Sequence, residues 1–146
     1  RLGSISSGGR YDSLATDGKR SYPGVGISLG LTRLLMPLLA RGELAASRSV
    51  PSCVVVAVDA EQTRTTAMQV AAALRARGIA CEVAPKADKY GKQIRYADRR
   101  GIPYVWFGGV SGEVKDIRSG DQVAADARVW TPPKADARPR VIAGGQ

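Results

Sequence analysis

Two periodicities alternate in the second part of the chain, and together they predict an α/β domain. Short runs rich in β-branched and aromatic residues have the length and composition of strands. These runs are residues 53–58, 80–84, 104–107, 113–117 and 122–129. Two segments with apolar residues three and four positions apart predict helices, at residues 63–77 and 88–100. Because the order is strand-helix-strand-helix-strand, we expect a mixed, mostly parallel sheet with helices on both faces.

A shorter apolar pattern comes first in the chain. Residues 8–12 form a turn-rich entry, residues 25–30 alternate like a strand, and residues 31–39 predict an apolar helix that Pro37 kinks or ends. A segment of this size cannot bury its own apolar surface as a domain. It is therefore predicted to be the last strands and helix of a larger antiparallel sheet. Since the chain opens on Arg1 rather than Met, we expect it to be part of a longer protein.

Changes in composition predict the boundaries of these parts. Residues 47–52 combine Ser, Arg and Pro, as a linker does, and residues 132–146 are rich in Pro, Arg, Ala and Gly and are predicted to be disordered. The expected organisation is an incomplete unit at 1–46, a linker at 47–52, a domain at 53–131 and a tail at 132–146.

The charge balance adds a candidate partner. The chain has 146 residues with 22 Lys and Arg against 13 Asp and Glu, a net charge of +9 that suggests nucleic acid. Residues 86–101 hold six of these cations and two carboxylates. On a helical wheel, one face collects Lys89, Lys92, Arg95, Tyr96 and Arg99. The opposite face collects Tyr90, Ile94, Ala97 and Gly101. Exposed cations with an aromatic suit phosphate contacts and base stacking, although spacing alone favours a solvated helix face equally.

Other residue types exclude several functions. The sequence contains no histidine, so no mechanism that needs an imidazole base or a histidine metal ligand can reside in it. Its two cysteines, Cys53 and Cys81, are too few for a zinc cluster, and their apolar neighbours predict buried thiols. No metal site is expected. No apolar run approaches the length that spans a bilayer, so no membrane partner is expected.

Two motifs carry a resemblance to a known family. The stretches GGRYD at 8–12 and GVGISLGLTRL at 24–34 resemble the end of the class II aminoacyl-tRNA synthetase catalytic core, in particular that of the histidyl-tRNA synthetase family. The basic stretch 89–98 and the stretch 114–122 resemble the α/β anticodon-binding domain of the same family. The resemblance covers residues 4–130.

The resemblance implies three groups of site residues. Gly24, Gly26, Gly30 and Arg33 would bind ATP, with Arg33 at the γ-phosphate. Gly8, Gly9 and Tyr11 would bind histidine, beside a structural pair formed by Arg10 and Asp12. The anticodon-binding helix would contact tRNA-His through Lys89, Lys92, Arg95, Tyr96 and Arg99, with Tyr96 as a stacking residue.

The resemblance also implies an activity for the parent protein. It would activate histidine with ATP and Mg²⁺ to histidyl-adenylate and charge tRNA-His, as a cytoplasmic homodimer. The motifs that supply the dimer interface, the α-phosphate arginine and the catalytic arginine do not occur in these residues. We therefore expect no complete catalytic site, no bound cofactor and no activity from this chain alone. Thr32 replaces the usual acidic residue before Arg33, and the anticodon-binding domain is predicted to end early, with Trp130 covering the sheet.

Three alternatives remain at this point. The first is a non-catalytic synthetase-like paralogue that acts as an RNA-binding or regulatory module. The second is a regulatory subunit of ATP phosphoribosyltransferase, which generally lacks the anticodon-binding domain, so that residues 52–130 argue against it. The third is a small doubly wound nucleotide-binding domain. Its first strand-to-helix turn, residues 59–62, has two carboxylates and no glycine and would repel phosphate.

Overall fold

The computed structural model describes residues 3–143, which divide into two compact units. One unit contains residues 3–45 and 142–143. The other unit is Ala46–Val141.

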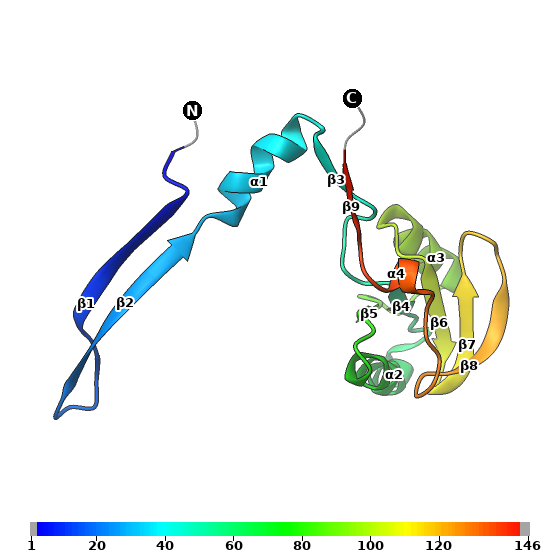
Figure 1. Cartoon of the computed structure of the whole chain (residues 1–146). Coiled ribbons are helices and arrows are strands. Elements are labelled where there is room, and N and C mark those ends of the chain that lie inside the picture. Colours follow the sequence, from blue (N-terminus) through cyan, green and yellow to red (C-terminus); the bar gives the residue numbers. More distant parts are fainter. Residues whose placement is uncertain (1–2, 144–146) are drawn as a thin grey trace. The chain divides into compact units, whose positions relative to one another are not determined.

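The larger unit, Ala46–Val141, is built on a five-stranded mixed sheet (Figure 1). In spatial order its strands are β5 (Cys81–Val83), β4 (Val54–Val56), β6 (Tyr104–Gly108), β7 (Ser111–Asp116) and β8 (Gln122–Asp126). Strand β4 pairs in parallel with β5 and β6, and the pairs β6–β7 and β7–β8 are antiparallel. The mixed α/β fold predicted from the sequence is confirmed.

Two helices cover this sheet. A short 3-10 turn, η1 (Glu61–Thr63), leads into α2 (Arg64–Ala76), which follows β4, and α3 (Tyr90–Arg99) follows β5. The first crossover moves from β4 to one neighbour, and the second moves back past β4 to the other. Because parallel crossovers are right-handed, α2 and α3 lie on opposite faces of the sheet (Figure 1).

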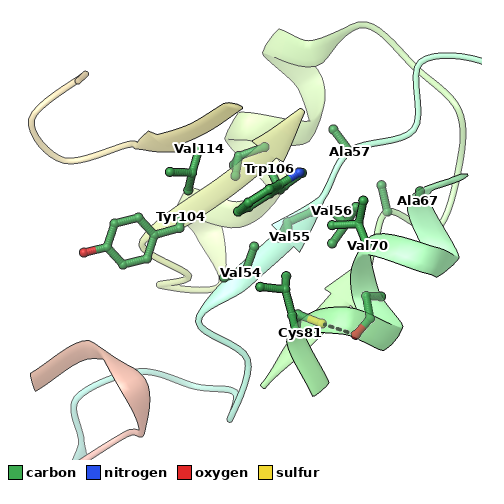
Figure 2. Close-up of a cluster of buried hydrophobic side chains, with 14 of the residues drawn as sticks. Val54, Val55, Val56, Ala57, Ala67, Val70, Cys81, Tyr104, Trp106 and Val114 are labelled. Atoms are coloured by element: carbon green, nitrogen blue, oxygen red, sulfur yellow. Dashed lines mark hydrogen bonds between the residues drawn. The ribbon is translucent and has the colours of Figure 1, made fainter. Parts of the chain in front are cut away.

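The core explains why the central strand reads as one apolar run. Val54, Val55 and Val56 are all fully buried, since helices cover both faces of β4 (Figure 2). The predicted inward face of α2 is buried too: Ala67, Val70, Ala71 and Leu74. The thiols of Cys53 and Cys81 are free and buried, and burial raises the pKa of Cys53 to about 11. Both cysteines therefore act as core residues in this fold.

The smaller unit contains an antiparallel hairpin and a helix. Its strands are β1 (Ser6–Thr16) and β2 (Ser21–Leu29), and α1 (Leu31–Ala40) follows. Two details differ from prediction. Residues 8–12 are strand and not turn, because residues 8–11 pair across the hairpin. Helix α1 also does not end at Pro37 but continues to Ala40.

The end of the chain also differs from the disorder that we predicted for residues 132–146. Helix α4 (Lys134–Ala137) lies there, and β9 (Val141–Ala143) pairs with β3 (Leu44–Ala46). Asp136 holds α4 in place by accepting hydrogen bonds from Arg118 and from the Tyr104 hydroxyl. The last residues of the predicted tail, 144–146, lie outside the described residues.

The predicted linker and Trp130 are both packed against the larger unit. Arg48 is 9% exposed and donates hydrogen bonds to the carbonyls of Val50, Pro51 and Asp136. The Trp130 ring makes edge contacts with Tyr104 and Trp106, at centroid distances of 5.4 and 5.9 Å. Trp130 therefore covers the sheet in the way that the sequence suggested. No helix in residues 3–143 is long and apolar enough to cross a membrane.

Candidate nucleic-acid interface

A buried glutamine positions helix α3. The side chain of Gln93 is 4% exposed and forms two hydrogen bonds with the backbone of Val58, which lies just after β4. Its Oε1 accepts from the Val58 N–H at 2.9 Å, and its Nε2 donates to the Val58 carbonyl at 2.8 Å. Gln93 also donates to the Asp88 carbonyl just before the helix. These bonds set the rotation of α3 about its axis.

That rotation places four of the predicted cations in solvent. Lys89, Lys92, Arg95 and Arg99 are all exposed, as the wheel predicted. Lys92 forms an ion pair with Asp88, at 2.9 Å between Nζ and Oδ2. Within residues 3–143, no carboxylate oxygen lies within ion-pairing distance of Lys89, Arg95 or Arg99. Three cations on this face are therefore available to an anionic partner.

Tyr96 is less accessible on this face than the four cations, and its role as a stacking residue stays a prediction. Its hydroxyl donates to Glu82 Oε2 at 3.0 Å, and the Arg100 guanidinium lies 5.3 Å from the ring centroid. Burial and the bond to Glu82 raise the pKa of Tyr96. The side chain is half-buried because the inward face of α3 centres on Gln93 and Ala97 and not on Tyr90.

Three of the predicted residues come together around one groove. Lys92, Tyr96 and Arg99 line a cavity of about 260 Å³ between α3 and the segment after β5. Lys86, which we did not single out, adds a further cation to the lining. Lys89 and Arg95 lie outside the lining of this groove. The lining thus combines three cations and an aromatic side chain with one carboxylate, Asp88, which pairs with Lys92. Cations beside an aromatic ring suit a phosphate with its base.

The predicted histidine-binding residues lie on the hairpin of the smaller unit. In its register Gly9 is opposite Gly26, and Tyr11 is opposite Gly24. The Tyr11 ring lies over Gly26, where an added Cβ would be 2.8 Å from Tyr11 Cε2. Gly26 is therefore required for the position of Tyr11. The hairpin thus brings all three histidine-binding candidates next to two of the ATP-binding candidates.

The other two ATP-binding candidates line a separate hollow. Gly30 and Arg33 belong to a cavity of about 610 Å³ formed by residues 4–7 and 28–33. The Arg33 Nη1 donates to the Ser4 carbonyl at 2.7 Å, and the Gly30 N–H donates to the Ile5 carbonyl at 2.7 Å. Arg33 keeps further donors for a phosphate. The structure does not bring Gly24 and Gly26 into the lining of this cavity.

Comparison with known proteins identifies the family. Residues 52–123 match the family model described as the anticodon binding domain. The chain is 66% identical, over 97% of its length, to the histidine–tRNA ligase of Cutibacterium acnes. The chain belongs to the histidyl-tRNA synthetase family.

Further relatives agree with this assignment. The histidine–tRNA ligase of Micrococcus luteus is 56% identical over 97% of the chain. The crystal structure of histidyl-tRNA synthetase from Nostoc sp. PCC 7120 superposes on 86% of the chain with a TM-score of 0.56 and 37% identity. The chain spans about a third of these proteins: 33% of the Cutibacterium ligase, 32% of the Micrococcus ligase and 32% of the Nostoc chain.

Proposed function

We propose that this chain supplies the tRNA-His-binding domain, and one wall of the ATP and histidine site, of a longer histidine–tRNA ligase. The observation that carries the proposal is the row of exposed cations on α3, in a domain whose family binds anticodons. Lys89, Arg95 and Arg99 would contact phosphates of the anticodon arm, and the groove at Lys92, Tyr96 and Arg99 would take an adjoining nucleotide.

In the longer protein, histidine would attack the α-phosphate of ATP to give histidyl-adenylate and pyrophosphate. The histidyl group would then pass to the 3′ end of tRNA-His. Arg33 would hold the γ-phosphate as a delocalised cation and align the leaving pyrophosphate. Gly8, Gly9 and Tyr11 would bound one side of the histidine pocket, against the hairpin positions Gly24 and Gly26.

The described residues fit ATP better than they fit Mg²⁺. Arg33 and Gly30 line a hollow that can take a phosphate, as described above. Magnesium, when bound, would share the phosphate charge, but residues 3–143 contain no group of three acidic or other ligating side chains. We therefore assign no residue of this chain to Mg²⁺. The remaining catalytic groups would belong to the longer protein, and it is the longer protein that would form a homodimer in the cytoplasm.

We expect the 146-residue chain to be inactive by itself, because the chain holds only Arg33 and one wall of the substrate site. Histidine-dependent exchange of pyrophosphate into ATP measures the first step directly. The background is the exchange measured without histidine. A rate with histidine that exceeds this background would contradict the expectation.

Binding of tRNA-His to variants of the chain tests the proposed interface. The double substitution Arg95→Glu and Arg99→Glu reverses two exposed cations without breaking an ion pair of the described structure. We expect it to weaken binding at least tenfold at moderate salt, because each lost phosphate contact also removes released counterions. A matched double reversal, Arg128→Glu and Lys134→Glu, changes the same charge on exposed residues away from α3 and should have a much smaller effect. Equal losses in the two variants would show that binding depends on net charge and not on this helix.

A further inference from the structure

A segment near the end of the described residues, 132–141, holds the linker in place. The Ser47 N–H donates to the Arg140 carbonyl at 2.9 Å, and the Arg140 N–H donates to Ser47 Oγ at 2.9 Å. The Arg48 Nη1 donates to the Asp136 carbonyl at 2.7 Å. All four residues belong to the larger unit. Two stretches that are far apart in the sequence are therefore joined by main-chain and guanidinium hydrogen bonds.

Arg48 is the centre of this junction. Its Nε donates to the Val50 carbonyl at 3.0 Å, and its Nη2 donates to the Pro51 carbonyl at 2.9 Å. The linker thus winds round one guanidinium that is 9% exposed. A buried guanidinium needs acceptors for its donors, because an unpaired donor away from water costs free energy. Without the Asp136 carbonyl, Arg48 is therefore expected to turn out into solvent.

The last turn of α3 supports the linker from the other side. The Ser49 hydroxyl donates to the Arg100 carbonyl at 3.1 Å. Gly101 lets the backbone of the linker come close, since a Cβ added there would lie 3.1 Å from the Arg48 Cβ. The linker is therefore held between the end of α3 and residues 132–141.

Polar contacts, and not a core, keep residues 132–141 on the domain. No side chain from 133 to 141 is buried. The anchor is the Asp136 carboxylate, which accepts from the Tyr104 hydroxyl at 2.8 Å and from Arg118 at 2.8 and 2.9 Å. A cavity of about 280 Å³ remains between this segment, the linker and the end of α3. Because partly exposed hydrogen bonds contribute only modestly to stability, the segment can detach while the sheet stays folded.

We propose that residues 132–141 act as a latch on the linker. When the latch is closed, residues 47–51 are fixed on the end of α3, and when it is open they form a flexible connection. Because the linker joins the two units, the latch sets how stiffly the larger unit is connected to the rest of the chain. This device goes beyond the proposed function, since the α3 cations proposed to contact phosphates do not line the cavity at the latch: Lys89, Arg95 and Arg99.

Trypsin cleavage after Arg48 measures opening of the latch, because a protease cuts a folded chain only where it opens locally. Asp136→Ala removes the bonds to Tyr104 and Arg118 that anchor the segment. We expect this variant to be cut after Arg48 about tenfold faster than the unchanged chain, as measured by mass spectrometry of the early products. Cleavage after Arg41, which is exposed, gives the reference rate and should stay within about twofold.

A matched control changes the same segment without touching its anchor. Arg138 is exposed and takes no part in the hydrogen bonds described above, so Arg138→Ala should leave the rate of cleavage after Arg48 unchanged. Hydrogen exchange gives a second measurement without a protease. The Ser47 amide, whose acceptor is the Arg140 carbonyl, should exchange about tenfold faster in Asp136→Ala and at the normal rate in Arg138→Ala.

A shortened chain that ends at Thr131 lacks the latch. It should be cut after Arg48 as fast as after Arg41, while cleavage within α2 after Arg75 stays slow. Thermal unfolding checks that each variant is folded, and Asp136→Ala, which keeps the full length, carries the test if the shortened chain does not fold.

Two results would overturn the latch. One is an unchanged rate of cleavage after Arg48 in folded Asp136→Ala. The other is an equal rise after Arg48 and after Arg75, which would show that residues 132–141 open only when the whole domain unfolds. Binding of tRNA-His is a separate readout: it should be the same in Asp136→Ala and in the unchanged chain, and its failure in both would contradict the proposed function without changing the cleavage result.

Discussion

At the residue scale, the two buried polar side chains of this domain, Gln93 and Arg48, have partners that are distant in sequence. Gln93 pairs with Val58, 35 positions away, and Arg48 donates to Asp136, 88 positions away. Sequence patterns predicted the exposed cations of α3, because an amphipathic wheel marks a solvent face. They could not predict Gln93 or Arg48, since a polar residue at a buried position is recognised only once its partner is in place.

Substitution of Asp136 tests how much such polar contacts stabilise the fold. Arg118 donates to both Asp116 and Asp136, and Tyr104 donates to Asp136, so that the pKa of Asp116 falls to about 2 and that of Asp136 is lowered. These carboxylates stabilise the fold above their unfolded pKa, near 4, and lose that contribution as the pH falls through the folded value. We expect Asp136→Asn to lower the free energy of unfolding at pH 7 by about 1 kcal/mol, a modest figure because Arg118 is half exposed.

The pH dependence distinguishes this explanation from a simple packing loss. The difference in unfolding free energy between Asp136→Asn and the unchanged chain should narrow as the pH is lowered from about 4 to 2, measured by urea unfolding. Asp98→Asn, an exposed carboxylate that lines the same cavity as Asp136, should change little. A difference that stays constant with pH would rule out the ionised network as its cause.

At the element scale, the type and order of the helices and strands followed from periodicity and from glycine stops. Helices α2 and α3 are both followed by glycines with positive φ, 76° at Gly78 and 70° at Gly101. The strand at residues 8–12 was missed, because two adjacent glycines read as a turn unless the opposite strand is known. The rotation of α3 was misjudged around Tyr96, because a wheel of mixed residues does not show which polar side chain finds a buried partner.

The two glycine stops differ in their surroundings, which gives a matched pair of substitutions. An added Cβ meets nothing within 4 Å at Gly78, but at Gly101 it would lie 3.1 Å from the Arg48 Cβ. Gly78→Ala should cost about 1 kcal/mol of unfolding free energy, from the left-handed backbone alone. Gly101→Ala should cost clearly more, because it also displaces the buried Arg48. If both variants lose the same unfolding free energy in thermal or urea unfolding, Arg48 moves aside without a cost in stability.

At the scale of the whole molecule, the net charge of +9 is spread over several surfaces, since exposed cations such as Arg128 and Lys134 lie away from α3. Many cations of the larger unit are engaged within it: Arg64 by Glu61, Arg118 by Asp116 and Asp136, and Arg48 by backbone carbonyls. The total charge predicted a nucleic-acid partner, but only the pairing of individual cations shows that α3 retains unpaired ones.

The salt dependence of tRNA-His binding tests whether the cations of α3 contact phosphates or only add to the net charge. The slope of log K against log salt concentration reports the number of phosphates contacted, at about 0.7 to 0.9 for each contact. The Arg95→Glu and Arg99→Glu variant should therefore reduce the magnitude of the slope by roughly one to two units. Reversal of Arg128 and Lys134 should leave the slope nearly unchanged. A slope equal in both variants would indicate diffuse attraction by the whole molecule.

The sequence by itself determined the mixed α/β class, the central apolar strand, the helix ends and the family. Each of these depends on neighbouring residues: strand and helix periods, glycine stops, and short motifs such as GGRYD. The tertiary structure alone decided which polar groups are buried, how α3 is rotated, that residues 132–143 are ordered, and that Arg48 of the linker binds Asp136. Those features depend on contacts between residues tens of positions apart, which form only when the sheet brings its strands together.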